Sequence, residues 1–280
     1  MGITRRQKRS PQRRDQRTRR SPLSVKEFSR CNPANGQKGK CLPMDVYRRL
    51  KKDVGDACGA DQEHCLLDRA SNLSDEQKRQ LRSTYLRPRY PSEWKQKPDT
   101  WLDDLQIKTV LKQYEAAHPW FHFMGVYPID FSAPDPYHPG SDKCLYPDVC
   151  ALNLKQEYEK GVRIIGFVFN LDPHFKSGSH WVSMYVDIRD LKKPFVGYFD
   201  SYGFQPPHLV RKLMRALRIQ APSTRLAYNA RRFQFSTTEC GVYSIYFLVS
   251  MLSGIPFKRF CKKRISDATM IELRKALFTE

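Results

Sequence analysis

Residues 231–253, RRFQFSTTECGVYSIYFLVSMLS, change from polar to almost uniformly apolar at Cys240. An apolar run of this length predicts a helix that is buried on all sides, which Gly254 and Pro256 would end. The N-terminus of a helix carries partial positive charge and unpaired N–H groups, which stabilise a thiolate. Cys240 is therefore a candidate nucleophile, although a cysteine in front of an apolar helix is more often an inert buried thiol.

The segments before this helix predict a sheet. Short runs of β-branched and aromatic residues, separated by turn residues, predict strands at 162–171, 181–188, 194–200 and 233–235. Residues 207–219 predict an amphipathic helix. We therefore predict an α+β fold, in which a mixed, mostly antiparallel sheet is surrounded by helices and the Cys240 helix packs against the sheet.

Composition divides the chain of 280 residues into three parts. Residues 1–22 are rich in Arg, Gln and Ser and predict a disordered basic arm, residues 23–95 a helical accessory region, and residues 96–280 the main domain. Turn and capping residues mark three helix starts: Pro43 (with Gly55 at the end of that helix), Ser74 with Gln77, and Thr100 with Asp103.

The net charge is +20, from 49 Lys plus Arg against 29 Asp plus Glu, and the first 20 residues hold nine bases and one acid. Such a balance indicates affinity for an anionic partner such as nucleic acid. Apolar runs fall far short of the roughly 18 residues that span a membrane, and the first residues lack the apolar stretch of a secretory signal. We expect an intracellular protein without a membrane segment.

The eight cysteines include no C-x-x-C pair. In a reducing compartment most of them are expected to be free thiols. Four of them, together with His64, form a loose group that could bind zinc, but the spacings do not match a usual zinc motif: Cys31, Cys41, Cys58 and Cys65.

Two further residues suit activation of the Cys240 thiol. His180 lies in GSHW at the entry to a predicted strand, and an imidazole can accept a thiol proton and later protonate a leaving amine. Asp200 ends the next predicted strand and could orient that imidazole. His174 is the rival base, and Asp187 and Asp190 are alternative acids that lie at the far end of the strand that begins beside His180.

The side-chain amide of Gln234, six residues before Cys240, could stabilise an oxyanion together with the Cys240 backbone N–H. The ordered set of H-W, YFDS-x-G and Q-x5-C-G before an apolar helix resembles the SUMO-specific (ubiquitin-like) cysteine protease superfamily. This superfamily includes adenovirus protease and the polyprotein proteases of large DNA viruses. Trp101-Leu102-Asp103-Asp104 is similar to a further motif of the family, so the resemblance covers about residues 100–260.

The resemblance implies a role for each matching residue: nucleophile for Cys240, general base and acid for His180, orienting acid for Asp200, and oxyanion donor for Gln234. Trp101 and Trp181 match the pair that encloses a Gly-Gly segment of the substrate, although either could instead be a core residue. The implied protein is a monomeric thiol protease that cleaves viral structural polyproteins after glycine. It would work in the virion, host cytoplasm or nucleus, would require no cofactor or metal, and would have DNA as a candidate activator.

Three alternatives stay open. The same residues would serve an isopeptidase that removes ubiquitin or a ubiquitin-like protein, or an acyltransferase. A basic DNA-packaging protein without enzymatic activity would explain the charge but gives the four-residue set no role. Glu239 stands where the family commonly has Asp, and residues 31–90 have no counterpart that we recognise in the SUMO proteases.

Overall fold

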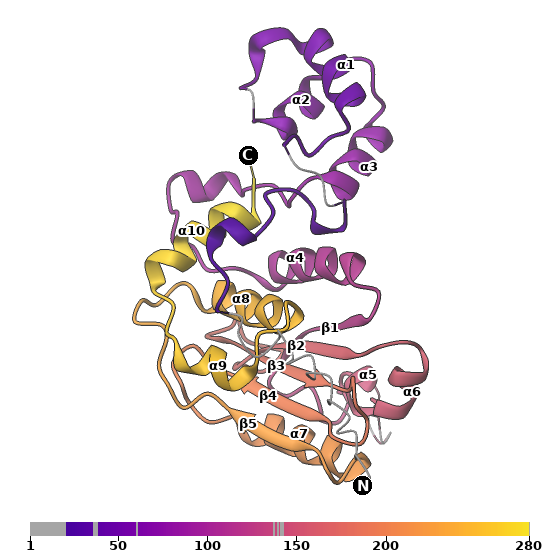
Figure 1. Cartoon of the computed structure of the whole chain (residues 1–280), viewed down its shortest axis with the longest axis vertical. Coiled ribbons are helices and arrows are strands. Elements are labelled where there is room, and N and C mark those ends of the chain that lie inside the picture. Colours follow the sequence, from indigo (N-terminus) through magenta and orange to yellow (C-terminus); the bar gives the residue numbers. More distant parts are fainter. Residues whose placement is uncertain are drawn as a thin grey trace, which may run out of the picture.

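The computed structural model describes residues 21–35, 39–59, 61–136, 138, 140 and 143–279. The predicted basic arm, except for its last two residues, lies outside this part of the chain. A sheet covered by helices on both faces forms the main body, and a small helical lobe lies at one end of it (Figure 1). Within the described part of the chain, no helix is long and apolar enough to cross a membrane.

The sheet has five strands in the order of the sequence: β1 (Phe121–Pro128), β2 (Ile164–Asn170), β3 (Trp181–Asp187), β4 (Phe195–Phe199) and β5 (Arg225–Tyr228). The two central pairings, β2 with β3 and β3 with β4, are antiparallel. The two outer pairings are parallel. The predicted α+β fold with a mixed sheet is confirmed, with parallel and antiparallel pairings in equal number.

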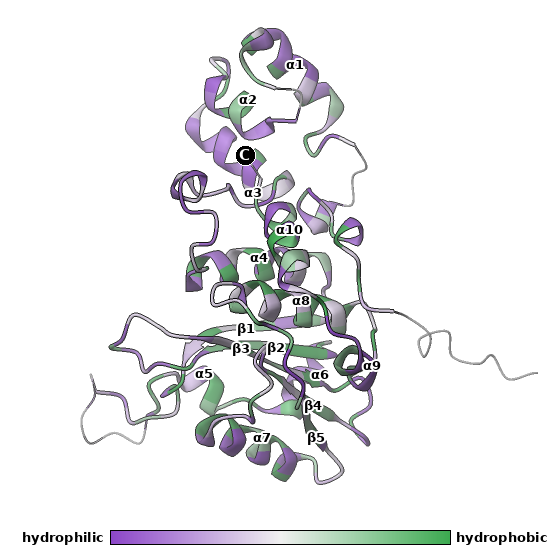
Figure 2. Ribbon diagram, turned by 90° about the vertical axis from the view of Figure 1, so that its left-hand side faces the viewer, coloured by the Kyte–Doolittle hydropathy of each residue, from purple (hydrophilic) through white to green (hydrophobic). Residues whose placement is uncertain are grey.

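One face of the sheet is covered by α4 (Asp104–Ala117) and α8 (Cys240–Leu252), and the other by α7 (His208–Gln220), α5 (Pro147–Cys150) and α6 (Leu154–Glu159), as Figures 1 and 2 show. Side chains alternate along β2, so Ile164 and Val168 face α8 while Ile165 and Phe167 face α7. Every residue of α8 is buried, as its composition predicts. The chain ends with α9 (Phe257–Lys262) and α10 (Asp267–Leu277).

The accessory lobe consists of α1 (Met44–Val54), α2 (Glu63–Arg69) and α3 (Asp75–Tyr85), with short 3-10 turns at Pro33–Asn35 and Gly55–Ala57. Two further 3-10 turns, Val25–Glu27 and Ser92–Lys95, pack against the core of the main body. The first helix begins after Pro43 and ends at Gly55, and Ser74 and Gln77 form the predicted capping box. The lobe has its own small apolar core: Cys31, Cys41, Leu42, Leu50, Cys58, Leu66, Leu67, Ala70 and Leu86.

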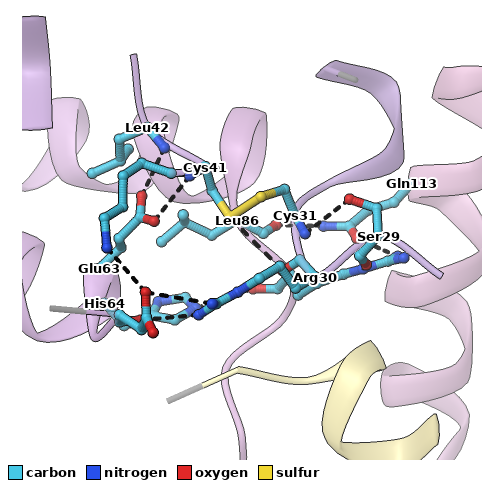
Figure 3. The surroundings of a disulfide bond; sticks show 12 residues. Ser29, Arg30, Cys31, Cys41, Leu42, Glu63, His64, Leu86 and Gln113 are labelled. Atoms are coloured by element: carbon cyan, nitrogen blue, oxygen red, sulfur yellow. Dashed lines mark hydrogen bonds and ion pairs between the residues drawn. A yellow bond between two sulfur atoms is a disulfide. The ribbon is translucent and has the colours of Figure 1, made fainter. Parts of the chain in front are cut away.

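The expectation of mostly free thiols is wrong. All eight cysteines are described, and six of them form the disulfides Cys31–Cys41, Cys58–Cys65 and Cys144–Cys150. Turns bring the Cα atoms of each pair within 5.2 to 6.5 Å, a separation that a disulfide can bridge. The four cysteines of the loose zinc group therefore bond to one another. Figure 3 shows the first pair beside Glu63, which accepts backbone N–H bonds from Cys41 and Leu42.

Two local predictions are also wrong. The third helix begins at Asp104 and not at Thr100, because the Asp103 side chain accepts the Gln106 N–H and the Thr100 hydroxyl bonds to the Lys97 carbonyl. Residues 233–235 form no strand, because the N–H groups of Phe233 and Gln234 both donate to the carbonyl of Ser201, which lies in a turn.

Candidate active site

The antiparallel pairing of β3 and β4 brings His180 and Asp200 together. Ser183 on β3 lies opposite Phe199 on β4, so the residue before β3 meets the residues just after β4. His180 Nε2 and Asp200 Oδ1 are 2.8 Å apart, and both side chains are buried. The sheet register thus produces the His–Asp contact that the sequence predicts.

Cys240 is the first residue of α8 and is 1% exposed. The next residue, Gly241, allows this helix to approach the Trp101 segment, because a Cβ at Gly241 would lie 3.0 Å from Leu102 Cβ. The Leu102 carbonyl accepts the indole N–H of Trp181 at 2.8 Å. Leu102 therefore joins the start of α8 to the start of β3, which directly follows the candidate base, His180.

The charge state of His180 is set by opposing effects. Burial alone would lower the pKa of His180, but hydrogen bonds with Asp200 and Cys240, together with their negative charges, outweigh burial and raise the pKa to about 9. At neutral pH the imidazole is therefore protonated, and it lies between a carboxylate and a thiol. This arrangement places a positive charge beside the Cys240 sulfur.

The fourth predicted residue, Gln234, is fully buried in the loop before α8. Its Oε1 accepts the Ser201 hydroxyl at 2.6 Å, and its Nε2 donates to the Ser236 carbonyl at 3.0 Å. The second N–H of the amide has only a long contact, 3.5 Å, with the Tyr202 hydroxyl. That N–H is therefore the donor that a developing oxyanion could engage.

The two predicted substrate-binding indoles line one cleft of about 400 Å³, and Tyr127, Tyr146 and residues of the loop 170–178 also line it. Trp101 is 41% exposed and Trp181 is 7% exposed. The interpretation of Trp101 as a core residue is therefore wrong, whereas Trp181 is mostly enclosed and presents little surface to the cleft.

The rival residues have other partners. His174 Nδ1 lies 2.7 Å from Asp130, and Asp187 pairs with Arg189 at the far end of β3. Asp190 accepts the Lys192 N–H in the turn after that strand. Among the described residues, no three His, Cys, Asp or Glu side chains are placed to hold a metal ion.

Sequence reasoning missed several residues that hold the site. Asn229 exchanges hydrogen bonds with the backbone of Asp200, at 2.8 and 2.7 Å. Glu239, next to Cys240, forms a buried ion pair with Arg274 of α10 at 2.9 Å. Ser201, which donates to Gln234, could have been found from its place in the YFDS motif. Arg274 could not, because it lies 34 positions after Cys240 and no motif marks it.

No family model matches the chain. A protein of Acanthamoeba polyphaga mimivirus, provisionally named a thiol protease, is 29% identical over 241 residues, which span 83% of this chain and 74% of the relative. The SUMO-1 cysteine protease of African swine fever virus is 35% identical over 119 residues, but these span 40% of this chain and 43% of the relative.

The crystal structure of the African swine fever virus protease superposes with a TM-score of 0.70 and 20% identity, over 92% of this chain and 97% of that chain. This likeness shows a shared fold. The relatives define the class that this chain resembles, because both are named as thiol or cysteine proteases. The predicted resemblance to the SUMO-specific (ubiquitin-like) cysteine protease superfamily is confirmed.

Proposed function

We propose that the chain is a thiol protease that cleaves after glycine, with Cys240 as nucleophile, His180 as base and acid, and Asp200 as the orienting acid. The observation that carries the proposal is the placement of His180, which bonds to Asp200 through Nε2 and interacts with Cys240 at the start of α8. An imidazole held between an orienting acid and a buried thiol is the arrangement that activates a cysteine nucleophile.

The Cys240 thiolate attacks the carbonyl carbon of the scissile peptide bond, and the carbonyl oxygen becomes an oxyanion. Two donors stabilise that charge: the Gln234 N–H that has only the long contact with the Tyr202 hydroxyl, and the Cys240 backbone N–H, which has no partner within the helix. The His180 imidazolium then protonates the amine, which leaves. Water attacks the remaining thioester, His180 accepts its proton, and Cys240 is released as a thiolate.

The two indoles support a preference for glycine. Trp181 is fixed by its hydrogen bond to Leu102, and the exposed Trp101 lies next to Leu102 in the chain. Flat aromatic faces can enclose a main chain that lacks side chains, whereas a Cβ or larger group would collide with them. We propose that this pair admits a Gly-Gly segment next to the scissile bond.

The proposed substrates are structural polyproteins with Gly-Gly-x sites, since the relatives are viral proteases. A library of peptides should be cleaved by the wild type with glycine enriched at the two positions before the cut. Cys240→Ser should cleave none of them. A profile without glycine enrichment would exclude the proposed specificity, and cleavage by the variant would exclude the nucleophile.

A second candidate is a deconjugating isopeptidase, because the African swine fever virus relative is named a SUMO-1 cysteine protease. Fluorogenic substrates that carry whole ubiquitin or SUMO before the cleaved bond separate the two functions. Much faster cleavage of these than of Gly-Gly-x peptides would favour deconjugation. Equal or slower cleavage would favour the polyprotein protease.

We further propose nonspecific nucleic-acid binding, with DNA as an activator. Arg211, Lys212, Arg215 and Arg218 form an exposed basic row on α7. Contacts with phosphates release counterions, so binding should weaken steeply between low and physiological salt. Anisotropy with labelled duplexes of unrelated sequence tests the binding, and hydrolysis with and without DNA tests activation. No binding at low salt would refute the proposal.

A further inference from the structure

Tyr202 contacts three of the four proposed catalytic residues. It lies two residues after Asp200, and its backbone N–H donates to Asp200 Oδ1 at 2.8 Å. Its ring stacks on the His180 imidazole, with centroids 4.6 Å apart and planes 24° apart. Its hydroxyl lies 3.5 Å from Gln234 Nε2 and donates to the Ser236 carbonyl at 3.2 Å. No role was assigned to this residue in the interpretation of the sequence.

The ring of Tyr202 is itself held in place. The guanidinium of Arg232 lies 5.2 Å from its centroid and donates to the Gln234 carbonyl. Gly203 has a φ of +80°, and a Cβ there would meet the Arg231 carbonyl carbon at 2.7 Å, so the turn after Asp200 lies directly against this segment. The tyrosine is therefore fixed between β4 and the loop before α8.

We propose that Tyr202 is a positioning residue: its ring sets the plane of the His180 imidazole and favours the imidazolium, while its hydroxyl orients the Gln234 amide. The inference rests on the proposed function. The π face of an aromatic ring attracts a cation. The other titratable groups that face His180 are Asp200 and Cys240, and Arg232 lies over the Tyr202 ring. Burial raises the pKa of Tyr202 above its ordinary value, so the ring stays neutral while His180 titrates.

Two variants of Tyr202 separate the role of its ring from the role of its hydroxyl. The pKa of His180 can be measured in each of them without a substrate. An NMR titration of ¹³C-labelled histidine in the full chain, with the His180 signal assigned from His180→Gln, gives the His180 pKa directly. Tyr202→Leu should lower that pKa by about half a unit to one unit and lower kcat/KM by about 10- to 100-fold through kcat. Tyr202→Phe should keep the His180 pKa and lower kcat by about 3- to 10-fold.

The matched control is Tyr47→Leu, which removes a half-buried tyrosine from α1 in the accessory lobe and should change neither quantity. An unchanged His180 pKa in Tyr202→Leu would overturn the inference, even if activity fell, because that result indicates a merely structural role. Equal effects of Phe and Leu would also overturn it, because the ring would then not matter. If the wild type cleaved no Gly-Gly peptide, the proposed function would fail, while the His180 titration would still decide the role of Tyr202.

Discussion

The accessory lobe and helix α8 of the main body use cysteine in opposite ways. The lobe has a small core in which three of the nine buried apolar residues are disulfide-bonded cysteines, and α1–α3 are largely polar (Figure 2). The body packs two large aromatic and aliphatic clusters against its sheet, and the buried thiol of Cys240 stays free. A small domain buries little apolar surface, so covalent links contribute a large share of its stability. The comparison shows that neighbouring structure, and not residue type, decides whether a cysteine stabilises or reacts.

The largest expected effect is the loss of catalysis on removal of the body's buried thiol. Cys240→Ala should lower kcat/KM on a Gly-Gly-x peptide by at least about 10⁴-fold, because no other group can form the thioester. Thermal unfolding should shift by no more than about 4 °C. Cys261→Ala is the control and should keep full activity, because burial raises the pKa of Cys261 to about 12 and keeps it protonated. If the Cys240→Ala variant still cleaved the peptide, Cys240 would not be the nucleophile, and the contrast between a reactive cysteine in the body and bonded cysteines in the lobe would be lost.

The second largest effect is expected for a buried side-chain amide of the site, and none is expected for an exposed side-chain amide of the lobe. Gln234→Ala should lower kcat by about 10²- to 10³-fold, with a smaller change in KM, because it removes an oxyanion donor. Gln80→Ala, on the exposed face of α3, should leave both constants unchanged. Steady-state kinetics on one peptide substrate measures both variants. A Gln234→Ala enzyme with wild-type kcat would show that the oxyanion has other donors.

Removing a disulfide from the lobe should have the opposite outcome to removing Cys240: it should lower stability and leave catalysis unchanged. The double variant Cys31→Ser, Cys41→Ser should lower the free energy of unfolding of the lobe by about 2–3 kcal/mol, since it frees a short loop in the unfolded chain. Hydrogen exchange of the amides in α1–α3 should accelerate. The amides of α8 and the hydrolysis of a short peptide should change little. Cys144→Ser, Cys150→Ser is the control, with no effect on the lobe. Equal acceleration in α8 would mean that the two regions unfold together.

The smallest expected effect is a dependence of stability on pH, and it comes from two histidines whose pKa values are shifted in opposite directions. Burial lowers the pKa of His64 in the lobe to about 4, whereas the pKa of His180 in the body is raised to about 9. Below pH 6.5 the unfolded state protonates at His64 before the native state does, so acid should destabilise the lobe by on the order of 2 kcal/mol by about pH 4. His180 contributes stability below pH 6.5 that is lost as the pH rises through 9, and kcat/KM should fall over the same range.

His64→Gln tests the acid side of this prediction, because it should flatten the pH dependence of α1–α3 exchange between pH 4 and 6.5. The pH profile of kcat/KM tests the alkaline side. A profile without a decline near pH 9 would contradict the charge state inferred for His180.

The site was predictable because its residues lie at the ends of elements that the sequence marks clearly. His180 and Asp200 flank strands rich in β-branched and aromatic residues, and Cys240 begins an apolar run. Pairings that no motif or capping pattern marks were not predictable. The Cys31–Cys41 and Cys58–Cys65 bonds depend on turns that spacing does not reveal, and Arg274 meets Glu239 through packing of α10. The short edge strand β5, RLAY, is too brief to show a period.

The central claim, that Cys240 attacks the carbonyl after glycine, can be tested by labelling. A peptide ending in Gly-Gly with a vinyl sulfone in place of the scissile bond should form one covalent adduct, and fragmentation mass spectrometry should locate it on Cys240. Replacing the last glycine by valine should abolish labelling, and His180→Gln should slow it strongly. An adduct on Cys261, or equal labelling by the valine probe, would contradict the account.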